Sequence, residues 1–327
     1  MAGDFLAGKA VLVTGGTGSF GRTLVSAILA TTRVRRVVVL SRDELKQYDM
    51  RRHHDGDDRL RFFIGDVRDA SRLYRAFDGV DIVVHAAALK QITTAEYNPL
   101  EAVRTNIRGA ENVIDASIDR GVGRVLALST DKASSPVNLY GATKLVSDKL
   151  FVAGNAYSGD RRTRIAVVRY GNVSESRGSV IPAFRELAKS GVLPITDERM
   201  TRFWITLPEA VRFVQTCLRA MRGGEIFVPK LPSMRIVDLA RAIAPAARLE
   251  HVGIRPGEKL HEEMVSESAA RHSRDMGDYF VIHPEMEWSN PGEDWGGKEL
   301  PDGFSYTSDR NDRWLSVEEL RTLVAET

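Results

Sequence analysis

Two side chains that could move a proton together lie four residues apart in this sequence. Tyr140 and Lys144 open a stretch with a helical pattern, and this spacing places both on one helix face, one turn apart. An ammonium beside a phenol favours the phenolate, so we expect Lys144 to lower the pKa of Tyr140. Such a pair suits alcohol–ketone chemistry. A solvated helix face could show the same spacing. How strongly the spacing supports a proton-transfer site therefore depends on the neighbouring sequence.

Four polar residues precede this pair at the tip of a predicted strand. The apolar run 124–128 indicates a buried strand, and Ser129, Thr130, Asp131 and Lys132 follow it. A hydroxyl from Thr130 or Ser129 could assist the tyrosine. Asp131 and Lys132 are a less usual pair, either an acid and a base for further proton transfers or a plain ion pair at a strand tip.

A glycine-rich loop near the N-terminus predicts a dinucleotide site that would position this chemistry. Residues 9–14 read as a strand, residues 22–30 read as a helix, and Gly15, Gly18 and Gly21 lie between them. The first glycine permits a tight turn, the second a close approach to a pyrophosphate, and the third close helix–strand contact. The phosphate would lie at a helix N-terminus, where free N–H groups favour anions.

The end of the next strand, 36–40, indicates which dinucleotide binds. An NAD site carries a carboxylate there that holds the ribose 2′-hydroxyl. This chain has Ser41 and Arg42 at the tip, with Lys46 one helical turn further on. Two cations and a hydroxyl donor suit a 2′-phosphate, although both cations could simply be solvated. We therefore expect NADP.

Strands alternate with helices throughout the first half of the chain. This alternation predicts an α/β fold, a Rossmann-type doubly wound parallel sheet, with strands at 9–14, 36–40, 60–64, 81–84, 124–128 and 165–169. We expect residues 1–170 to form the NADP-binding domain. Residues 171–327 should form a smaller, mainly substrate-binding domain, with some segments returning to the sheet.

Composition and single residues exclude several classes of protein. The 327 residues are 43% apolar and 28% charged with a net charge of +2, which gives no case for binding nucleic acid or an anionic membrane. Neither a transmembrane run nor a signal peptide is recognisable, so we expect a cytoplasmic protein. Cys217 is the only cysteine, which excludes a cysteine metal cluster. His261-Glu262 would need a second histidine at position 265 to form a zinc-protease motif, and that residue is Val265. We expect no metal.

Seven longer stretches carry a family resemblance. The motifs resemble the extended short-chain dehydrogenase/reductases, and in particular the inverting, C5-epimerising UDP-N-acetylglucosamine 4,6-dehydratases. The match runs over about 9–265 and resumes weakly at 311–315. The stretches are Thr-Gly-Gly-Thr-Gly-Ser-Phe-Gly, Ser-Arg-Asp-Glu-Leu-Lys-Gln, Phe-Phe-Ile-Gly-Asp-Val-Arg-Asp, Ser-Thr-Asp-Lys-Ala, Asn-Leu-Tyr-Gly-Ala-Thr-Lys, Met-Thr-Arg-Phe-Trp-Ile-Thr and Arg-Pro-Gly-Glu-Lys-Leu-His-Glu.

The resemblance also implies which residues hold the ligands. Together with the glycine loop and the strand tips, it assigns to NADP the residues Gly15, Thr17, Gly18, Ser19, Phe20, Gly21, Ser41, Arg42, Lys46, Asp66, Val67, Ala86, Lys90, Thr105, Tyr140 and Lys144. It assigns to a UDP-sugar the residues Lys90, Asn172, Thr196, Arg255 and Glu258. The family's habit further implies a homo-oligomer.

The reaction that the resemblance implies has internal hydride transfer and no net redox change. Tyr140, helped by Lys144, would take the C4 hydroxyl proton during oxidation at C4. Lys132 would remove the C5 proton, and Asp131 would protonate the leaving C6 hydroxyl. For this Lys132 must be neutral, which burial and the nearby cations Lys90 and Lys144 favour and an ionised Asp131 opposes.

Alternatives remain on the same scaffold. A net NADP oxidoreductase or a UDP-sugar 4-epimerase would need only the tyrosine and lysine of the helix, and a nucleotide-sugar sensor would need neither. Two positions depart from the family pattern, since Gln91 replaces a histidine and Glu175 a glycine on loops expected at the sugar. These departures leave the sugar and the stereochemistry at C5 open.

Overall fold

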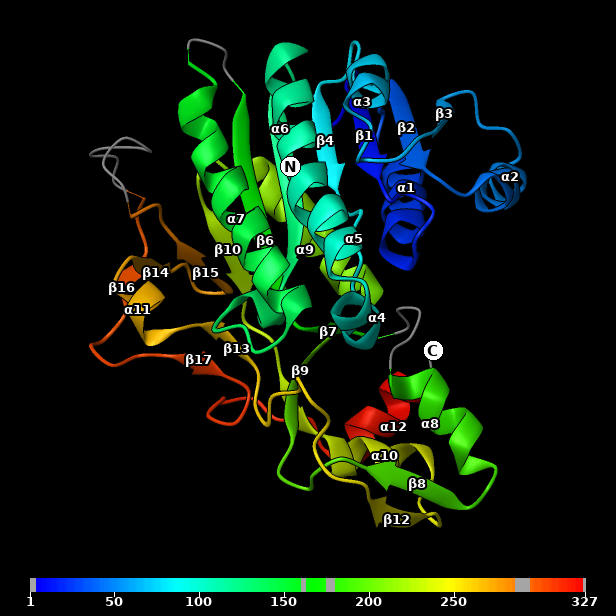
Figure 1. Cartoon of the computed structure of the whole chain (residues 1–327), viewed down its shortest axis with the longest axis vertical. Coiled ribbons are helices and arrows are strands. Elements are labelled where there is room, and N and C mark those ends of the chain that lie inside the picture. Colours follow the sequence, from blue (N-terminus) through cyan, green and yellow to red (C-terminus); the bar gives the residue numbers. More distant parts are fainter. Residues whose placement is uncertain (1–3, 160–162, 175–179, 286–294, 326–327) are drawn as a thin grey trace.

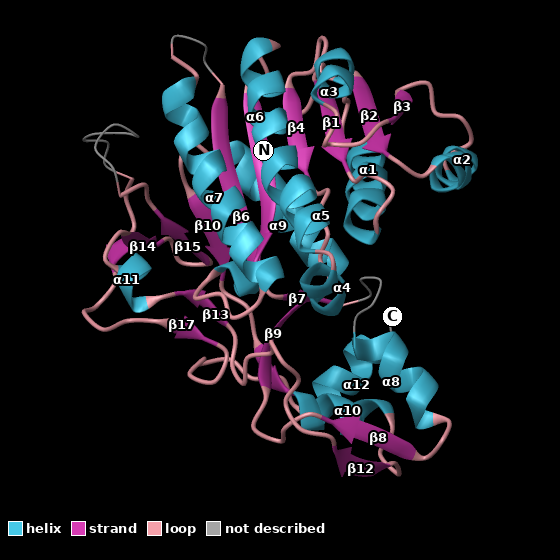
Figure 2. Ribbon diagram, in the orientation of Figure 1, coloured by secondary structure: helices cyan, strands magenta, loops and turns pink. Residues whose placement is uncertain are grey.

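The centre of the protein is a mixed, mostly parallel sheet. The computed structural model describes residues 4–159, 163–174, 180–285 and 295–325. Ten strands within these residues form one sheet in the order β16-β14-β15-β10-β6-β5-β4-β1-β2-β3 (Figures 1 and 2). The parallel strands are β1 (Ala10–Thr14), β2 (Arg36–Ser41), β3 (Leu60–Ile64), β4 (Ile82–His85), β5 (Arg124–Thr130), β6 (Arg164–Tyr170) and β10 (Ile226–Pro229). The antiparallel ones are β15 (Tyr279–Ile282), β14 (Ser273–Asp275) and β16 (Lys298–Glu299).

Burial on both faces explains why these strands read as continuous apolar runs. Every residue of β1 and β4 is buried, and so is nearly all of β2 and β6. Helices cover parallel sheets on both sides, so alternation of polar and apolar residues is lost. The predicted doubly wound parallel sheet is confirmed. The chain also adds β10 and the three antiparallel strands from beyond residue 171 to the sheet.

Helices pack on the two faces of the sheet. On one face α1 (Ser19–Thr31) contacts α9 (Leu207–Ala220). On the other, α6 (Gly109–Asp119) contacts both α3 (Ala70–Ala76) and α7 (Leu139–Tyr157), and α6 and α7 lie side by side in Figure 1. The helix α2 (Glu44–His53) follows β2 and packs beside β2 and β3.

The helical segment between β4 and β5 is interrupted by one wider turn. The segment divides into α5 (Pro99–Val103), a π-helical turn η1 (Arg104–Arg108) and α6, preceded by the short α4 (Ile92–Tyr97). In η1 the N–H of Gly109 bonds to the carbonyl of Arg104. Asn106, in this turn, holds the backbone of Leu89, accepting from its N–H at 2.9 Å and donating to its carbonyl at 2.9 Å. Such π turns often accompany functional sites, and this one fixes the loop that carries Lys90.

A smaller part with its own core lies beside the carboxyl ends of the parallel strands (Figure 1). Its buried residues include Ile181, Leu193, Leu239 and Leu320. Its elements are β7 (Asn172–Val173), α8 (Val180–Ala188), β8 (Val192–Ile195), β9 (Thr201–Ile205), β11 (Ser233–Arg235), α10 (Ile236–Ile243), β12 (Arg248–His251) and α12 (Val317–Ala325). The elements β13 (Glu263–Val265), α11 (Glu267–Ala270) and β17 (Tyr306–Thr307) connect it to the main sheet. Among the described helices, none has the length and apolar character needed to span a membrane.

Candidate active site

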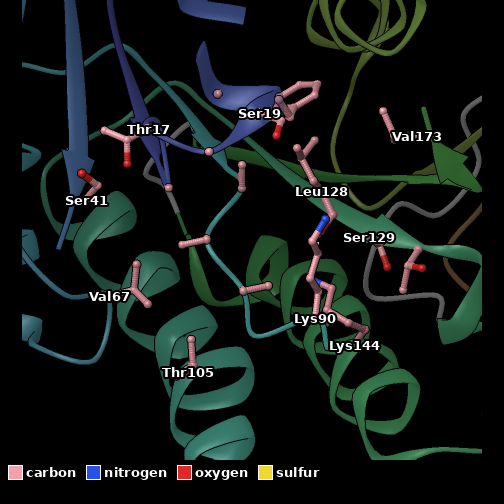
Figure 3. A pocket seen from close by; sticks show the side chains of 18 of the residues that line it. Thr17, Ser19, Ser41, Val67, Lys90, Thr105, Leu128, Ser129, Lys144 and Val173 are labelled. Atoms are coloured by element: carbon pink, nitrogen blue, oxygen red, sulfur yellow. Dashed lines mark hydrogen bonds between the residues drawn. The ribbon is translucent and has the colours of Figure 1, made fainter. Parts of the chain in front are cut away.

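A cavity of about 610 Å³ opens where the parallel strands end. Every residue that the sequence analysis assigned to NADP lines it. Figure 3 shows Thr17 and Ser41 on one side of this cavity and Ser129 on the other, with Lys90 and Lys144 between them and lower in the view. Oγ1 of Thr105 is buried at the cavity wall without a hydrogen-bond partner among the described residues. A buried, unsatisfied hydroxyl there is what a bound polar ligand would satisfy.

The glycine loop has the geometry expected of a phosphate cradle. Gly15 has a φ of +65°, and a Cβ on it would lie 2.9 Å from the backbone nitrogen of Ala87. The N-cap of α1 is Gly18, so no N-cap side chain occupies the first turn of that helix. An anion would therefore meet the backbone N–H groups of the first helical turn and the positive end of the helix dipole.

The end of β2 presents cations to the same cavity. Arg42 lies 3.6 Å from the carboxylate of Asp66, Lys46 forms an ion pair with Asp43, and Ser41 lines the wall beside them. Burial alone would raise the pKa of Asp66, but its hydrogen bonds with Arg68 and the charge of Arg42 lower it overall. Arg42 and Lys46, the two cations predicted to bind a 2′-phosphate, therefore each have a carboxylate partner already. A bound 2′-phosphate would share these cations with the carboxylates.

Tyr140 and Lys144 face the cavity from the first turns of α7. The side chain of Asn138 caps this helix by accepting from the N–H of Gly141 at 2.8 Å. Nζ of Lys144 donates to the carbonyl of Leu128 at 2.8 Å. A Cβ on Gly141 would lie 2.2 Å from the carbonyl oxygen of Lys132, so α7 packs directly on the turn that follows β5.

The pKa of Tyr140 differs from our expectation. The pKa of Tyr140 is raised to about 12, because burial raises it by more than the charge of Lys132 and an interaction with Thr130 lower it. The expected lowering by Lys144 is therefore wrong for this structure, because its ammonium bonds to a backbone carbonyl of β5 and the phenol is desolvated. Burial also lowers the pKa of Lys144, while Asp148 raises it.

Asp148 separates the roles of the two strand-tip hydroxyls. It lies four residues after Lys144 on the same helix, and its Oδ2 accepts from Oγ of Ser129 at 2.8 Å and from Arg169 at 3.1 Å. The hydroxyl of Ser129 therefore donates its hydrogen bond to Asp148, and the hydroxyl of Thr130 is the one that interacts with Tyr140. The sequence analysis missed Asp148, although its spacing from Lys144 repeats that between Tyr140 and Lys144.

Asp131 and Lys132 occupy a short 3₁₀ turn, η2 (Asp131–Ala133), directly after β5. Lys132 lines the cavity, whereas Asp131 is fully buried and does not. Oδ1 of Asp131 accepts from Oγ1 of Thr130 at 2.9 Å and from Nζ of Lys132 at 3.0 Å. The predicted role of Asp131 as an acid that touches the sugar therefore does not fit this arrangement, because only Lys132 reaches the cavity.

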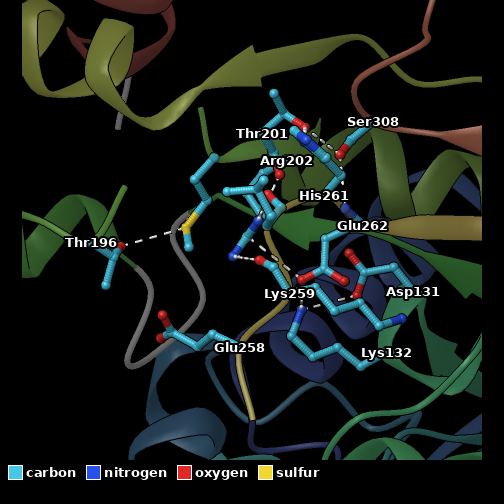
Figure 4. Close-up of polar contacts among 12 residues, drawn as sticks. Asp131, Lys132, Thr196, Thr201, Arg202, Glu258, Lys259, His261, Glu262 and Ser308 are labelled. Carbon is cyan, nitrogen blue, oxygen red and sulfur yellow. Dashed lines mark hydrogen bonds and ion pairs between the residues drawn. The ribbon is translucent and has the colours of Figure 1, made fainter. Parts of the chain in front are cut away.

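Glu262 joins this pair from a distant part of the chain. Its Oε1 lies 3.0 Å from Nζ of Lys132 and 3.6 Å from Nε of Arg202 (Figure 4). Arg202, in β9, also donates to the carbonyls of Lys259 at 3.0 Å and Leu260 at 3.1 Å. Two of the family-like stretches, 200–206 and 255–262, thus meet at one buried carboxylate.

Apart from its place at the end of a family-like stretch, Glu262 entered the sequence analysis only in the exclusion of a zinc site. One signal could have found it, namely an arginine inside the apolar strand 201–205, because a buried cation needs a buried partner. Among the described residues, no group of three or more metal-ligating side chains is present.

The charges around Lys132 keep it protonated. Burial would lower the pKa of Lys132, but the carboxylates of Asp131 and Glu262 raise it overall. Burial and the charge of Glu262 raise the pKa of Asp131. Burial would raise the pKa of Glu262, but Lys132 and Arg202 lower it overall. The expectation that nearby cations such as Lys90 and Lys144 would neutralise Lys132 is therefore wrong, because the carboxylates of Asp131 and Glu262, each 3.0 Å from its ammonium, outweigh burial.

The predicted sugar ligands fall into two groups. Lys90 and Asn172 line the cavity, and burial lowers the pKa of Lys90. Thr196, Arg255 and Glu258 are not among the residues that line it. Thr196 donates to Sδ of Met200 at 3.5 Å, and Arg255 lies 3.8 Å from Glu258. Of the two departures from the family pattern, Gln91 lines the cavity and Glu175 lies outside the described residues.

Known proteins resemble this chain along its length. It is 50% identical to a UDP-N-acetylglucosamine 4,6-dehydratase (inverting) from Campylobacter jejuni subsp. jejuni, over 98% of each chain. It is 40% identical to a UDP-glucose 4-epimerase from Rickettsia canadensis, over 97% of this chain and 95% of that protein.

Two solved structures share the fold. The X-ray structure of Pen from Bacillus thuringiensis superposes with a TM-score of 0.90, at 35% identity over 98% of each chain. A dTDP-glucose 4,6-dehydratase from Streptomyces venezuelae, DesIV with NAD and TYD bound, superposes with a TM-score of 0.68, at 28% identity over 77% of this chain and 86% of that one. Residues 11–284 match the family described as Polysaccharide biosynthesis protein. The chain belongs to this polysaccharide biosynthesis protein family.

Proposed function

We propose that the protein is an NADP-dependent hydro-lyase, an inverting UDP-N-acetylglucosamine 4,6-dehydratase. The carrying observation is that one cavity presents two separate proton-handling groups, Tyr140 with Lys144 from α7 and Lys132 from η2. Oxidation at C4 needs the first group alone, whereas elimination across C5 and C6 needs a second. The 50% identity to the Campylobacter jejuni dehydratase supports the same assignment.

The cavity residues fit a nicotinamide dinucleotide. The loop from Gly15 to Gly21 and the first turn of α1 would hold its pyrophosphate, and Thr105 would supply a hydroxyl that has no hydrogen-bond partner among the described residues. We propose NADP over NAD because Arg42 and Lys46 lie at the end of β2, where an NAD site carries a ribose-binding carboxylate. Cofactor released from denatured protein should carry the 2′-phosphate, and recovery of NAD alone would contradict this choice.

The protein's own residues supply the proton transfers. A nicotinamide dinucleotide held by the glycine loop and α1 would supply hydride transfer from C4 to C6. As the phenolate, Tyr140 would take the C4 hydroxyl proton, with Thr130 beside it and Lys144 one turn further along α7. The C4 ketone acidifies the C5 proton, which Lys132 at the cavity wall would remove while it is in its neutral form. The ammonium formed in this way would return a proton to the departing C6 hydroxyl, which leaves as water. Asp131 acts on the sugar only through Lys132, since it lies behind that residue.

The rival function is a UDP-sugar 4-epimerase, which the identity to the Rickettsia canadensis protein supports. An epimerase oxidises and reduces the same carbon, so it leaves C5 and C6 untouched. The buried charges around Lys132 would then have no chemical role. A difference in the product therefore separates the two functions.

The deciding experiment is incubation with UDP-N-acetylglucosamine in deuterated water, followed by NMR of the product. We expect a 4-keto-6-deoxy sugar nucleotide with deuterium at C5 and inverted configuration there, formed without added cofactor. A C4 epimer that keeps its C6 hydroxyl would favour the epimerase. Stoichiometric NADPH would instead indicate a net oxidoreductase.

Further expectations are part of the proposal and rest on the family resemblance. Residues 1–170 would hold mainly the cofactor and residues 171–327 mainly the UDP-sugar, with Lys90 and Asn172 placed to contact it. The protein would act as a homo-oligomer in the cytoplasm. Light scattering on the purified protein measures its oligomeric state directly.

A further inference from the structure

The side chain of Lys132 is held between two buried carboxylates from different parts of the chain. Its Nζ lies 3.0 Å from Asp131 and 3.0 Å from Glu262 (Figure 4). The exposed fraction is 21% for the Lys132 side chain and at most 2% for either carboxylate. Lys132 lines the cavity and Glu262 does not. Glu262 therefore acts on the cavity through Lys132.

The two carboxylates are not equivalent partners. Asp131 already accepts from Thr130, and both burial and the charge of Glu262 favour its protonated form. Glu262 is kept ionised by Lys132 and Arg202. Protonation of Asp131 alone would therefore leave a full negative charge beside Lys132.

Charged and titratable groups surround this contact on several elements. Lys132 is faced by Asp131 from its own turn, by Arg202 from β9 and by the phenol of Tyr140 from α7. Lys259 also acts on Glu262 electrostatically and, like Arg202, favours its ionised form. Oε2 of Glu262 is buried and has no hydrogen-bond partner within the part of the chain that the structure describes. The ion pair with Lys132, at 3.0 Å, is thus the shortest ion pair that Glu262 forms among the described residues.

We infer that Glu262 is a positioning residue for Lys132, fixing its ammonium at the cavity wall and setting the pH at which it becomes a neutral amine. The inference deepens the proposed dehydratase function, in which Lys132 must be neutral before it can remove the C5 proton. It assigns a role to a residue that touches neither the cavity nor the sugar.

The first test needs no substrate. Lysine labelled with ¹³C at Cε gives the titration of Lys132 by NMR, with the signal assigned by its absence in Lys132→Met. Replacing Glu262 by Gln removes one charge at 3.0 Å, so the pKa of Lys132 should fall by about 1–3 pH units. The matched control is Glu263→Gln, since Glu263 accepts from Ser134 at 3.0 Å and Ser135 at 2.8 Å instead. An unchanged Lys132 titration in Glu262→Gln, or an equal change in the control, overturns the inference.

A reciprocal measurement covers the case in which Glu262→Gln does not fold. In Lys132→Met the carboxyl of Glu262 loses its nearest cation, so its pKa should rise, as read from ¹³C-labelled glutamate. No rise would overturn the inference equally.

The kinetic consequence is tested separately. With UDP-N-acetylglucosamine, the rising limb of the pH–rate profile should move to lower pH in Glu262→Gln, which a purely structural role would not produce. A changed Lys132 titration in a protein that forms no dehydrated product would refute the proposed function and leave the role of Glu262 intact.

Discussion

Replacing Lys132 by methionine should cost both rate and stability, by amounts that the structure allows us to work out. Losing a general base lowers the rate by about 10²–10⁴-fold. The same change leaves Asp131 and Glu262 facing each other while at most 2% exposed. Removing one partner of a buried ion pair costs about 3–5 kcal/mol of unfolding free energy. At about 2 °C per kcal/mol for a chain of this length, Tm should fall by roughly 6–10 °C near pH 7.

The pH dependence of this stability loss has a definite sign. In the wild type the pKa of Glu262 is lowered, so its contribution is present above its unfolded value of about 4.3 and is lost as pH falls through the folded value. In Lys132→Met the two carboxylates favour protonation, because each is buried beside the other. The Tm difference between variant and wild type should therefore shrink as pH falls from 8 to 5.

Calorimetry at several pH values, combined with product NMR, measures both effects. Lys149→Met is the matched control, because Lys149 is 65% exposed and its pairing with Glu285 spans 3.8 Å. We expect that control to change stability by less than about 1 kcal/mol. A Lys132→Met variant that keeps the wild-type Tm at pH 8 and still exchanges deuterium into C5 at near the wild-type rate would refute the reasoning.

Three further predictions concern the choice of cofactor, the turnover and the choice of substrate. Replacing both Arg42 and Lys46 by Ala should weaken NADP binding by roughly 10–100-fold while leaving NAD binding nearly unchanged, as measured by calorimetric titration; an equal loss for both cofactors would contradict the 2′-phosphate assignment. Tyr140→Phe should lower turnover by about 10²–10⁴-fold without loss of bound cofactor, and turnover near the wild-type value would exclude the phenol as the proton acceptor at C4. Gln91→His combined with Glu175→Gly should change the preferred sugar or the configuration at C5, and unchanged kinetics with an unchanged product would show that these positions do not select the substrate.

The cofactor half of the site could be predicted because its signals are local. Each parallel strand ends at the same edge of the sheet, so the residue after each apolar run is placed there by the pattern alone. Arg42, Lys90 and Lys132 could be assigned to one cavity in this way. The fold class followed from the same alternation of strands and helices.

The charge states could not be predicted, because they depend on contacts between distant segments. Glu262 lies 130 positions from Lys132, and no spacing rule connects them. The desolvation of Tyr140 depends on how distant segments pack around the start of α7, and the periodicity of the sequence does not reveal that packing. The assignments of Thr196, Arg255 and Glu258 came from resemblance alone, and the structure does not place these residues at the cavity wall.

The close packing of Gly141 on the carbonyl of Lys132 couples the position of Tyr140 on α7 to that of Lys132 in the 3₁₀ turn. With only hydrogen at this position, the 3₁₀ turn touches the helix backbone directly, and a Cβ would stand 2.2 Å from that oxygen. The phenol one residue earlier and the ammonium of Lys132 therefore cannot be repositioned independently. Evolution or design could replace either side chain. A larger residue at position 141, however, would push α7 away from the turn and so change the relative placement of Tyr140 and Lys132.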